Sequence, residues 1–209
     1  MREHPIIFST PMVQAILDAS KTQTRRPIMP QPCKSTIAMV PAISGRHWIE
    51  QLPLDLRALH PESKPMTING KSIKCPYGQI GDRLWVREAF APALAEHGEC
   101  FKYKASKNHQ LYYQCGKECP EGVEAITKWK PSIHMPRWAS RIDLEITEIR
   151  AERLQDISEE DAIAEGWDAN NSAYSPLTWF EKLWDSINGK KYPWVNNDWV
   201  WVISFKVVK

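Results

Sequence analysis

The chain has 209 residues, of which 43% are hydrophobic and 25% are charged, a composition typical of one globular domain or of one domain with insertions. Its net charge of only +2 gives no whole-molecule argument for nucleic-acid binding. The apolar runs fall far short of the about 20 residues of a transmembrane helix, and the N-terminus lacks the apolar core of a signal peptide. We therefore expect a cytoplasmic protein with no membrane partner and no obligate protein partner.

The N-terminal part predicts a strand, a helix and a second strand. A strand begins at residues 5–8, and Ser9, Pro11 and apolar residues at helical spacing predict a helix over residues 10–19. Residues 22–26 should form the second strand. Prolines then interrupt the pattern, which indicates an irregular insertion at about 28–77.

The second half predicts alternating strands and helices around another insertion. A strand is expected at 83–88, followed by an insertion at about 92–135 with weak strand signals at 100–104 and 110–113. Alternation over residues 142–149 predicts a strand whose acids, Asp143, Glu145 and Glu148, face water. Helices are expected at about 158–165 and 175–188, with a closing strand at 199–207.

Residues 21–26 gather three cations and two hydroxyls directly after the first predicted helix. Such a cluster suits a phosphate or nucleobase site. A structural alternative is that Lys21 neutralises the negative end of that helix while Arg25 and Arg26 form a solvated face.

Glu165 has an unfavourable position for a residue that serves stability alone. Ser158 and Asp161 resemble a capping box and Gly166 resembles a helix terminator, so Glu165 falls in the last turn. There the helix dipole disfavours a negative charge by about 0.3–1 kcal/mol. A nearby cation would relieve this cost, with Lys21 as the best candidate. The alternative is an exposed glutamate that tolerates the penalty.

Residues 125–141 hold four bases, no acid and two tryptophans, Trp129 and Trp138. Basic side chains interleaved with aromatic ones suit a surface that follows a nucleic-acid strand. The alternative is that both tryptophans belong to the core beside solvated lysines. Of the other tryptophans, Trp167 and Trp194 are the remaining candidates for ligand contact, since most lie at core periods.

The five cysteines are odd in number and irregularly spaced, which favours free thiols over a disulfide framework. Cys115 and Cys119 could still join Cys100 or His109 in a zinc site within the second insertion. Neither a His-Glu-x-x-His motif, paired Cys-x-x-Cys motifs nor a glycine-rich phosphate loop is present. We expect no cofactor and no catalytic metal.

The chain resembles the ASCH domains of the PUA-like superfamily. The resemblance covers about half of the chain and lies in the first helix with the motif at residues 21–26, in residues 81–88, in residues 157–166 and in the terminal strand. Residues 75–78 and 134–141 look like the flanks of longer ASCH proteins from phages and prophages. The resemblance implies one α+β domain over residues 1–209, a small β-barrel with flanking helices and two insertions, whose cleft accepts a nucleotide or RNA.

The resemblance extends to ASCH amidohydrolases that act on N(4)-acetylcytidine, and it implies roles for three residues. Lys21 would be the proton acceptor, Thr24 the nucleophile and Glu165 the proton donor. General chemistry allows this, because a threonine hydroxyl needs a base and a lysine serves as one when burial or nearby cations lower its pKa. Strict strand alternation would put Lys21 and Thr24 on opposite faces, so Lys21 must lie in the turn before the strand.

Two further functions remain open from the sequence. The same cleft could bind a nucleoside or single-stranded RNA without turnover, or the protein could be a ribonuclease. The residues expected to contact substrate or RNA are Thr22, Arg25, Arg26, Glu88, Lys130, Arg137 and Trp138.

Overall fold

The structure is a computed structural model that describes residues 1–33, 36, 38–42, 47–54, 66–95, 98–106, 111–113, 128–170 and 172–208. It is a mixed α+β fold, rich in strands and with few helices. The strands are β1 (Glu3–Ile7), β2 (Gln23–Pro27), β3 (Ala38–Pro41), β4 (Trp48–Leu54), β5 (Met66–Ile73), β6 (Arg83–Arg87), β7 (Phe90–Ala95), β8 (Gly98–Tyr103), β9 (Leu111–Tyr113), β10 (Asp143–Arg153) and β11 (Trp199–Val207). The α-helices are α1 (Thr10–Leu17), α2 (Glu159–Ala164) and α3 (Pro176–Asn188), with 3-10 helices at Ser132–His134, Arg137–Ala139, Leu154–Asp156 and Trp194–Asn196.

The chain forms two compact units. The first comprises residues 1–22, 80–147 and 205–209, and the second comprises residues 23–79 and 148–204. The strand order of the five-stranded sheet is β1-β6-β10-β11-β2, and β3-β4-β5 and β7-β8-β9 form two separate antiparallel sheets. No closed barrel is formed by the strands that the structure describes.

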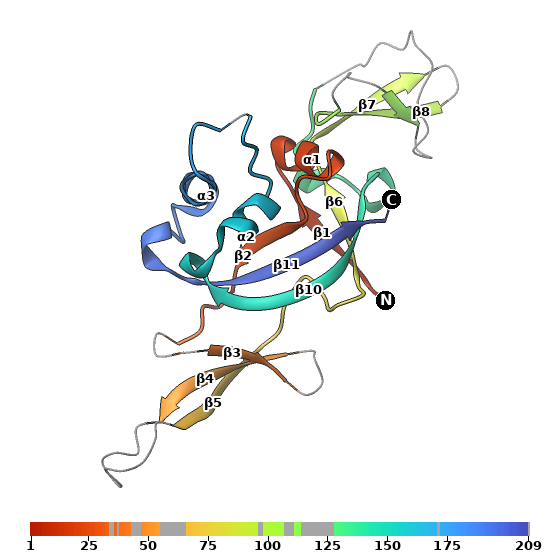
Figure 1. The fold of residues 1–209 in the computed structure, drawn as a ribbon. Coiled ribbons are helices and arrows are strands. Elements are labelled where there is room, and N and C mark those ends of the chain that lie inside the picture. Colours follow the sequence, from red (N-terminus) through yellow and green to blue (C-terminus); the bar gives the residue numbers. More distant parts are fainter. Residues whose placement is uncertain are drawn as a thin grey trace. The chain divides into compact units, whose positions relative to one another are not determined.

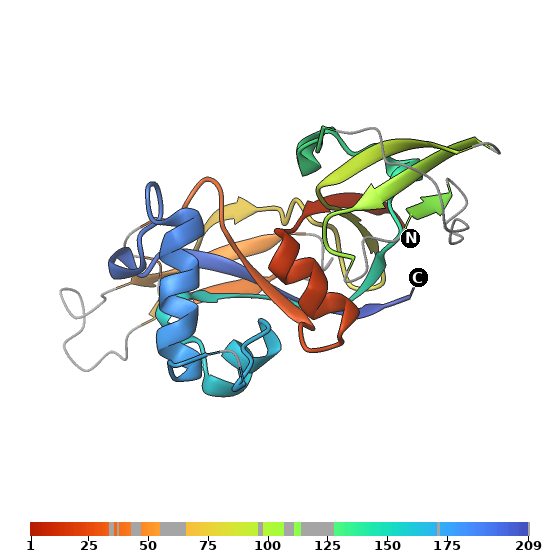
Figure 2. The ribbon, with the colours of Figure 1, turned by 90° about the horizontal axis from the view of Figure 1, so that it is seen from above.

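The second unit contains a helix-covered core. Helices α2 and α3 lie over one face of β2 and β11, and β3, β4 and β5 lie on the other side (Figure 1). Helix α3 crosses the direction of β11 (Figure 2). Ala162, Phe180 and Trp184 from the helices pack on Val200 and Val202 of β11. This packing fixes α2, and with it the residue at its C-terminal end.

The first unit contains a hairpin with its own small core. Strand β1 pairs in parallel with β6, and β10 pairs with β6 in antiparallel register. Phe90 of β7 and Phe101 and Tyr103 of β8 form a buried cluster with Met135 and Ala139. Residues 130–139 are therefore part of the packing of the hairpin.

The structure confirms the strands predicted near residues 5–8, 22–26, 83–88, 142–149 and 199–207 and the three predicted helices. It corrects the insertions. The first was expected to be irregular but contains the β3-β4-β5 sheet, where Pro41 is the last residue of β3 and interrupts no inner pairing. In the second, no strand signal was present in the sequence for β7, which contains Pro92; a strand at the edge of its sheet tolerates this proline.

One predicted surface position is wrong. Asp143 was expected to face water, but it is buried and accepts a hydrogen bond from Arg137 Nη2 at 3.0 Å. A buried carboxylate needs such a partner, and the alternation pattern of β10 cannot reveal one that comes from another segment. No helix in the described part of the chain is long and apolar enough to cross a membrane.

Candidate functional site

The three residues with predicted catalytic roles are all buried. Lys21 is 1% exposed, Thr24 is 2% exposed and Glu165 is 3% exposed. Lysine and glutamate are almost never fully buried unless they are paired, because removing a charge from water is costly. Lys21 belongs to the first unit, and Thr24 and Glu165 belong to the second. Their convergence in one site stays a prediction.

The turn after α1 positions Lys21. Ala19 adopts a left-handed conformation with φ of 58°, which is uncommon for a residue with a side chain. The backbone N–H groups of Ser20 and Lys21 both donate to the Ala15 carbonyl, at 2.9 and 3.0 Å. The Lys21 Nζ atom lies 5.8 Å from the centre of the Phe8 ring. As predicted, Lys21 lies before the first residue of β2.

Arg25 is the centre of an ion-pair cluster in the second unit. Its side chain is 0% exposed, and its Nη2 lies 2.5 Å from Glu152 Oε1 and 2.6 Å from Asp161 Oδ2. Its Nη1 lies 3.4 Å from Glu165 Oε1, and its guanidinium lies over the Phe180 ring at 5.6 Å. The predicted need of Glu165 for a cation is thus met by Arg25 in this unit.

Arg150 extends the cluster toward solvent. Its Nη2 lies 2.7 Å from Asp161 Oδ2 and its Nε lies 3.0 Å from Glu152 Oε2, while its side chain is 29% exposed. Gln23 Nε2 donates to Asp161 Oδ1 at 3.1 Å. Arg25, which is fully buried, and Arg150, which is partly exposed, therefore share the acids Glu152 and Asp161.

Helix α2 explains why Glu165 is placed beside Arg25. Ser158 accepts a hydrogen bond from the backbone N–H of Asp161 at 3.1 Å, which confirms the predicted cap. Gly166, with φ of 104°, ends the helix as predicted, so Glu165 is the last residue of helical conformation. Asp161, whose backbone N–H is held by the cap, also contacts Arg25. The short helix thus places the carboxylates of Asp161 and Glu165 beside this arginine of β2.

Thr24 and Arg25 point to opposite faces of β2. Arg25 lies opposite Val202 of β11, which belongs to the core beneath α2 and α3, whereas Thr24 lies opposite Ile203. Arg26 is on the face of Thr24, opposite Trp201. Trp201 packs edge-on against Trp48 of β4, with ring centres 5.6 Å apart.

Arg26, Tyr77 and Glu165 interact electrostatically. Burial lowers the pKa of Arg26, and the charges of Tyr77 and Glu165 act in the opposite direction. Burial likewise raises the pKa of the Tyr77 phenol, and Arg26 opposes that shift. Glu165 therefore acts on Arg25 and Arg26, whose side chains alternate across the strand.

The sequence reasoning did not identify Tyr77, Glu152 or Asp161 as parts of this site. Tyr77 had one signal, because it lies in the stretch at 75–78 that resembles longer ASCH proteins. For Glu152 and Asp161 the signal was indirect, since a buried arginine requires carboxylates that only the fold can assign.

The remaining residues with predicted binding roles lie in the first unit. Thr22 is exposed, and its carbonyl accepts a hydrogen bond from Phe205 N–H at 2.9 Å. Glu88 is buried and forms a bidentate pair with Arg141, at 2.9 and 3.1 Å. Arg137 pairs with Glu3 and Asp143, which raise its pKa. Lys130 and Trp138 are exposed.

No cluster of potential metal ligands is found among the described residues. Cys115, Cys119 and His109, and the side chain of Cys100, lie outside them, so the suggested zinc site is not described. Cys75 is buried, and burial raises the pKa of its thiol to about 11. That thiol is protonated at neutral pH and is no nucleophile.

The chain matches no protein-family model, no curated protein and no solved structure. The relation to ASCH domains is therefore a resemblance carried by the motifs alone.

The cluster around Arg25 predicts acid sensitivity. Burial would raise the pKa of Asp161, but hydrogen bonds from Arg150 and Arg25 outweigh it and lower that pKa. The stability from this ionised group is complete above its unfolded pKa of about 3.9 and is lost as pH falls through the lower folded value. We expect the free energy of unfolding in urea to fall from pH 5 to pH 3. In Asp161→Asn this fall should be smaller, and an identical pH profile would contradict the assignment.

Proposed function

We propose that the protein is an ASCH-type amidohydrolase that removes the acyl group from N(4)-acylated cytidine or a closely related nucleoside amide. The observation that carries the proposal is the burial of Lys21, Thr24 and Glu165, the three motif residues with expected catalytic roles. Polar side chains in an ordinary surface loop or helix end stay exposed, and burying all three has a cost that a reactive site explains. A PUA-like barrel with the two insertions is the fold that we propose for this activity.

The proposed reaction proceeds through an acyl-enzyme. Lys21 takes the hydroxyl proton of Thr24, whose Oγ1 attacks the carbonyl carbon of the amide. The carbon–nitrogen bond breaks as Glu165, in its protonated form, gives its proton to the leaving amine of cytidine. Water then attacks the threonine ester and gives one proton to the Glu165 carboxylate, while Lys21 returns its proton to the Thr24 oxygen; the carboxylic acid leaves, and all three side chains regain their starting forms.

Arg25 has a different role in this proposal from the ligand contact that the sequence suggested. Its guanidinium is fully buried and its donors are directed to Glu152, Asp161 and Glu165. It therefore serves as a positioning residue that orients the Glu165 carboxylate. Direct ligand contact falls to Arg26, on the face of β2 that carries Thr24.

A second candidate is a nucleotide-binding module without turnover. The electrostatic interaction of Arg26 with Tyr77 favours it, because a half-buried guanidinium near a phenol can recognise a phosphate or a base edge without any nucleophile. In this candidate, the burial of Thr24 and Lys21 would serve packing and recognition only.

Arg26→Lys is expected to weaken nucleotide binding at least about tenfold while the protein stays folded. Guanidinium offers paired, planar donors that an ammonium cannot reproduce, and a lost charged hydrogen bond is worth about 1.5–3 kcal/mol. Titration calorimetry with cytidine 5′-monophosphate and with N(4)-acetylcytidine measures the change, and thermal unfolding checks the fold. Unchanged affinity for both ligands would make Arg26 a structural ion-pair residue.

One incubation separates the functions. Purified protein is mixed with N(4)-acetylcytidine, a panel of other modified nucleosides and end-labelled single-stranded RNA, and the products are identified by mass. Release of cytidine and acetate supports the amidohydrolase, and shortened RNA supports a ribonuclease. Unchanged nucleosides and RNA, together with measurable nucleotide affinity, would favour the binding module.

A further inference from the structure

The segment of residues 128–138 in the first unit exposes large apolar side chains beside cations. Trp129 is 38% exposed, Ile133 is 56% exposed and Trp138 is 48% exposed. The segment contains Lys128, Lys130 and Arg137 and no acid. Large rings that remain at the surface next to cations are typical of a contact surface rather than of a core.

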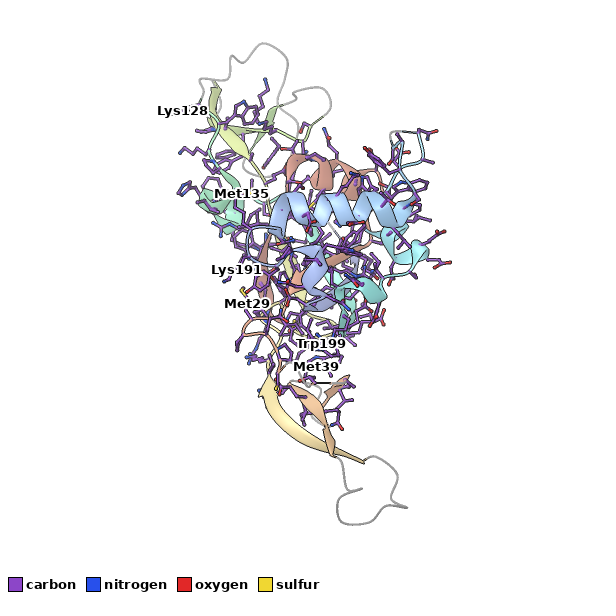
Figure 3. All side chains as sticks on the ribbon, turned by 90° about the vertical axis from the view of Figure 1, so that its left-hand side faces the viewer. Met29, Met39, Lys128, Met135, Lys191 and Trp199 are labelled. Atoms are coloured by element: carbon purple, nitrogen blue, oxygen red, sulfur yellow. The ribbon has the colours of Figure 1, made fainter. Side chains whose placement is uncertain are left out.

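This basic aromatic segment is held firmly against the β7-β8 hairpin. The backbone of Lys130 pairs with Phe90 through hydrogen bonds of 2.8 and 3.3 Å. The Tyr103 hydroxyl donates to the Ala139 carbonyl at 2.8 Å, and Met135 is 1% exposed between these two attachments. Lys128 lies at the exposed end of the segment and Met135 is its buried anchor (Figure 3). A partner would thus meet a preformed surface and would lose less conformational entropy on binding.

Trp138 and Lys130 lie on the same face of the hairpin. Residues opposite each other in a β-bridge point to the same side, and Phe90 is opposite both Lys130 and Tyr103. The ring of Trp138 packs edge-on against Phe101 of the same face, with ring centres 5.0 Å apart and planes at 63°. The edge-on contact with Phe101 therefore holds the Trp138 ring in place, while about half of the surface of Trp138 stays accessible.

Three described acids of the first unit pair with arginines. Glu3 and Asp143 both pair with Arg137, and Glu88 pairs with Arg141. Among the residues that the structure describes, no carboxylate forms an ion pair with Lys128 or Lys130. The surface therefore complements a partner that carries regularly spaced negative charge and flat rings.

We propose that the basic aromatic segment binds single-stranded RNA, with a base stacked on Trp138 and backbone phosphates on Lys130 and Lys128. Single strands offer both the unpaired bases and the phosphates that this pairing of tryptophan and lysine recognises. The choice of RNA over DNA rests on the proposed function, which acts on a ribonucleoside. The surface goes beyond that function, because it would let the protein hold a polynucleotide through residues remote in sequence from the catalytic motif.

The test is fluorescence anisotropy of the full chain with a labelled 15-nucleotide oligouridine at low salt. Trp138→Ala should raise the dissociation constant about fivefold or more, and Trp138→Phe should restore most of the affinity, because stacking on one ring is worth about 1–3 kcal/mol. Lys130→Ala should lower the slope of log K against log salt by about 0.7, the value for one lost phosphate contact on a single strand. Lys190→Ala, an exposed lysine of the other unit, is the matched control and should change neither quantity.

Three outcomes would overturn the proposal. These are wild-type protein that binds no oligouridine, affinities of Trp138→Ala and Lys130→Ala equal to that of wild type, or equal affinity for oligouridine and oligothymidine. The oligouridine carries no acyl group, so its binding is measured independently of turnover. A protein that hydrolyses no nucleoside can still pass this test, and an active enzyme can fail it.

Discussion

Thr24→Ala and Lys21→Ala are each expected to abolish hydrolysis of N(4)-acetylcytidine. Loss of the base lowers kcat by about 10²–10⁴-fold, and loss of the nucleophile should cost at least as much, since no other group forms the acyl-enzyme. The double variant should be little worse than either single variant, because the two side chains act as one unit. Thr24→Ser should retain part of the rate. Steady-state kinetics with each variant measure these effects.

Substrate affinity, measured in the same variants, distinguishes a catalytic role of Thr24 from a role in recognition alone. Removing the Thr24 hydroxyl should cost only about 0.5–1.5 kcal/mol of affinity, far less than the loss in rate. Thr147→Ala removes an exposed hydroxyl from β10 and is the matched control, with wild-type kinetics expected. Full activity in Thr24→Ala would refute the nucleophile assignment.

Arg25→Met is expected to lower the free energy of unfolding by about 3–5 kcal/mol, because it leaves acids in the cluster without their buried cation. Arg150→Met removes an equal charge that contacts two of the same acids, Glu152 and Asp161. Its side chain is 29% exposed, so solvent can compensate and the loss should be about 1 kcal/mol or less. Urea unfolding of both variants at pH 7 measures the difference. Equal losses would show that burial does not set the strength of the cluster.

A third variant, Arg25→Lys, tests the positioning role of Arg25. If Arg25 orients Glu165, Arg25→Lys should recover stability better than activity, because an ammonium keeps the charge but not the branched donors. Equal recovery of both would mean that Arg25 serves the fold alone.

Local signals in the sequence predicted the helices of the second unit well. The spacing from Ser158 to Gly166 predicted the limits of α2, and the apolar stripe from residue 179 to 187 predicted α3. Both signals are local, because helix caps and helical periodicity depend on residues that are close together in the sequence. The insertions were less predictable. Proline signals in the first insertion suggested irregular chain, and whether a proline breaks a strand depends on its place in a sheet that the sequence does not reveal.

In the candidate site, too, residues in a local motif were predictable from the sequence, and contacts made by the fold were not. The motif identified Lys21, Thr24 and Glu165, and all three are buried. The partners of Arg25 could not be predicted, because Glu152 and Asp161 lie more than a hundred residues away along the chain and meet it only through the fold. The same holds for Arg137 and Glu88, whose partners Glu3 and Arg141 come from distant segments.

The most direct test of the central claim is a single-turnover reaction with protein in excess over N(4)-acetylcytidine, quenched at intervals and separated by chromatography with mass detection. Excess protein makes even slow turnover visible and removes any dependence on product release. We predict conversion to equal amounts of cytidine and acetate by the wild type, and no conversion by Thr24→Ala. Acetylcytidine that persists unchanged with the wild type at full occupancy would contradict the account.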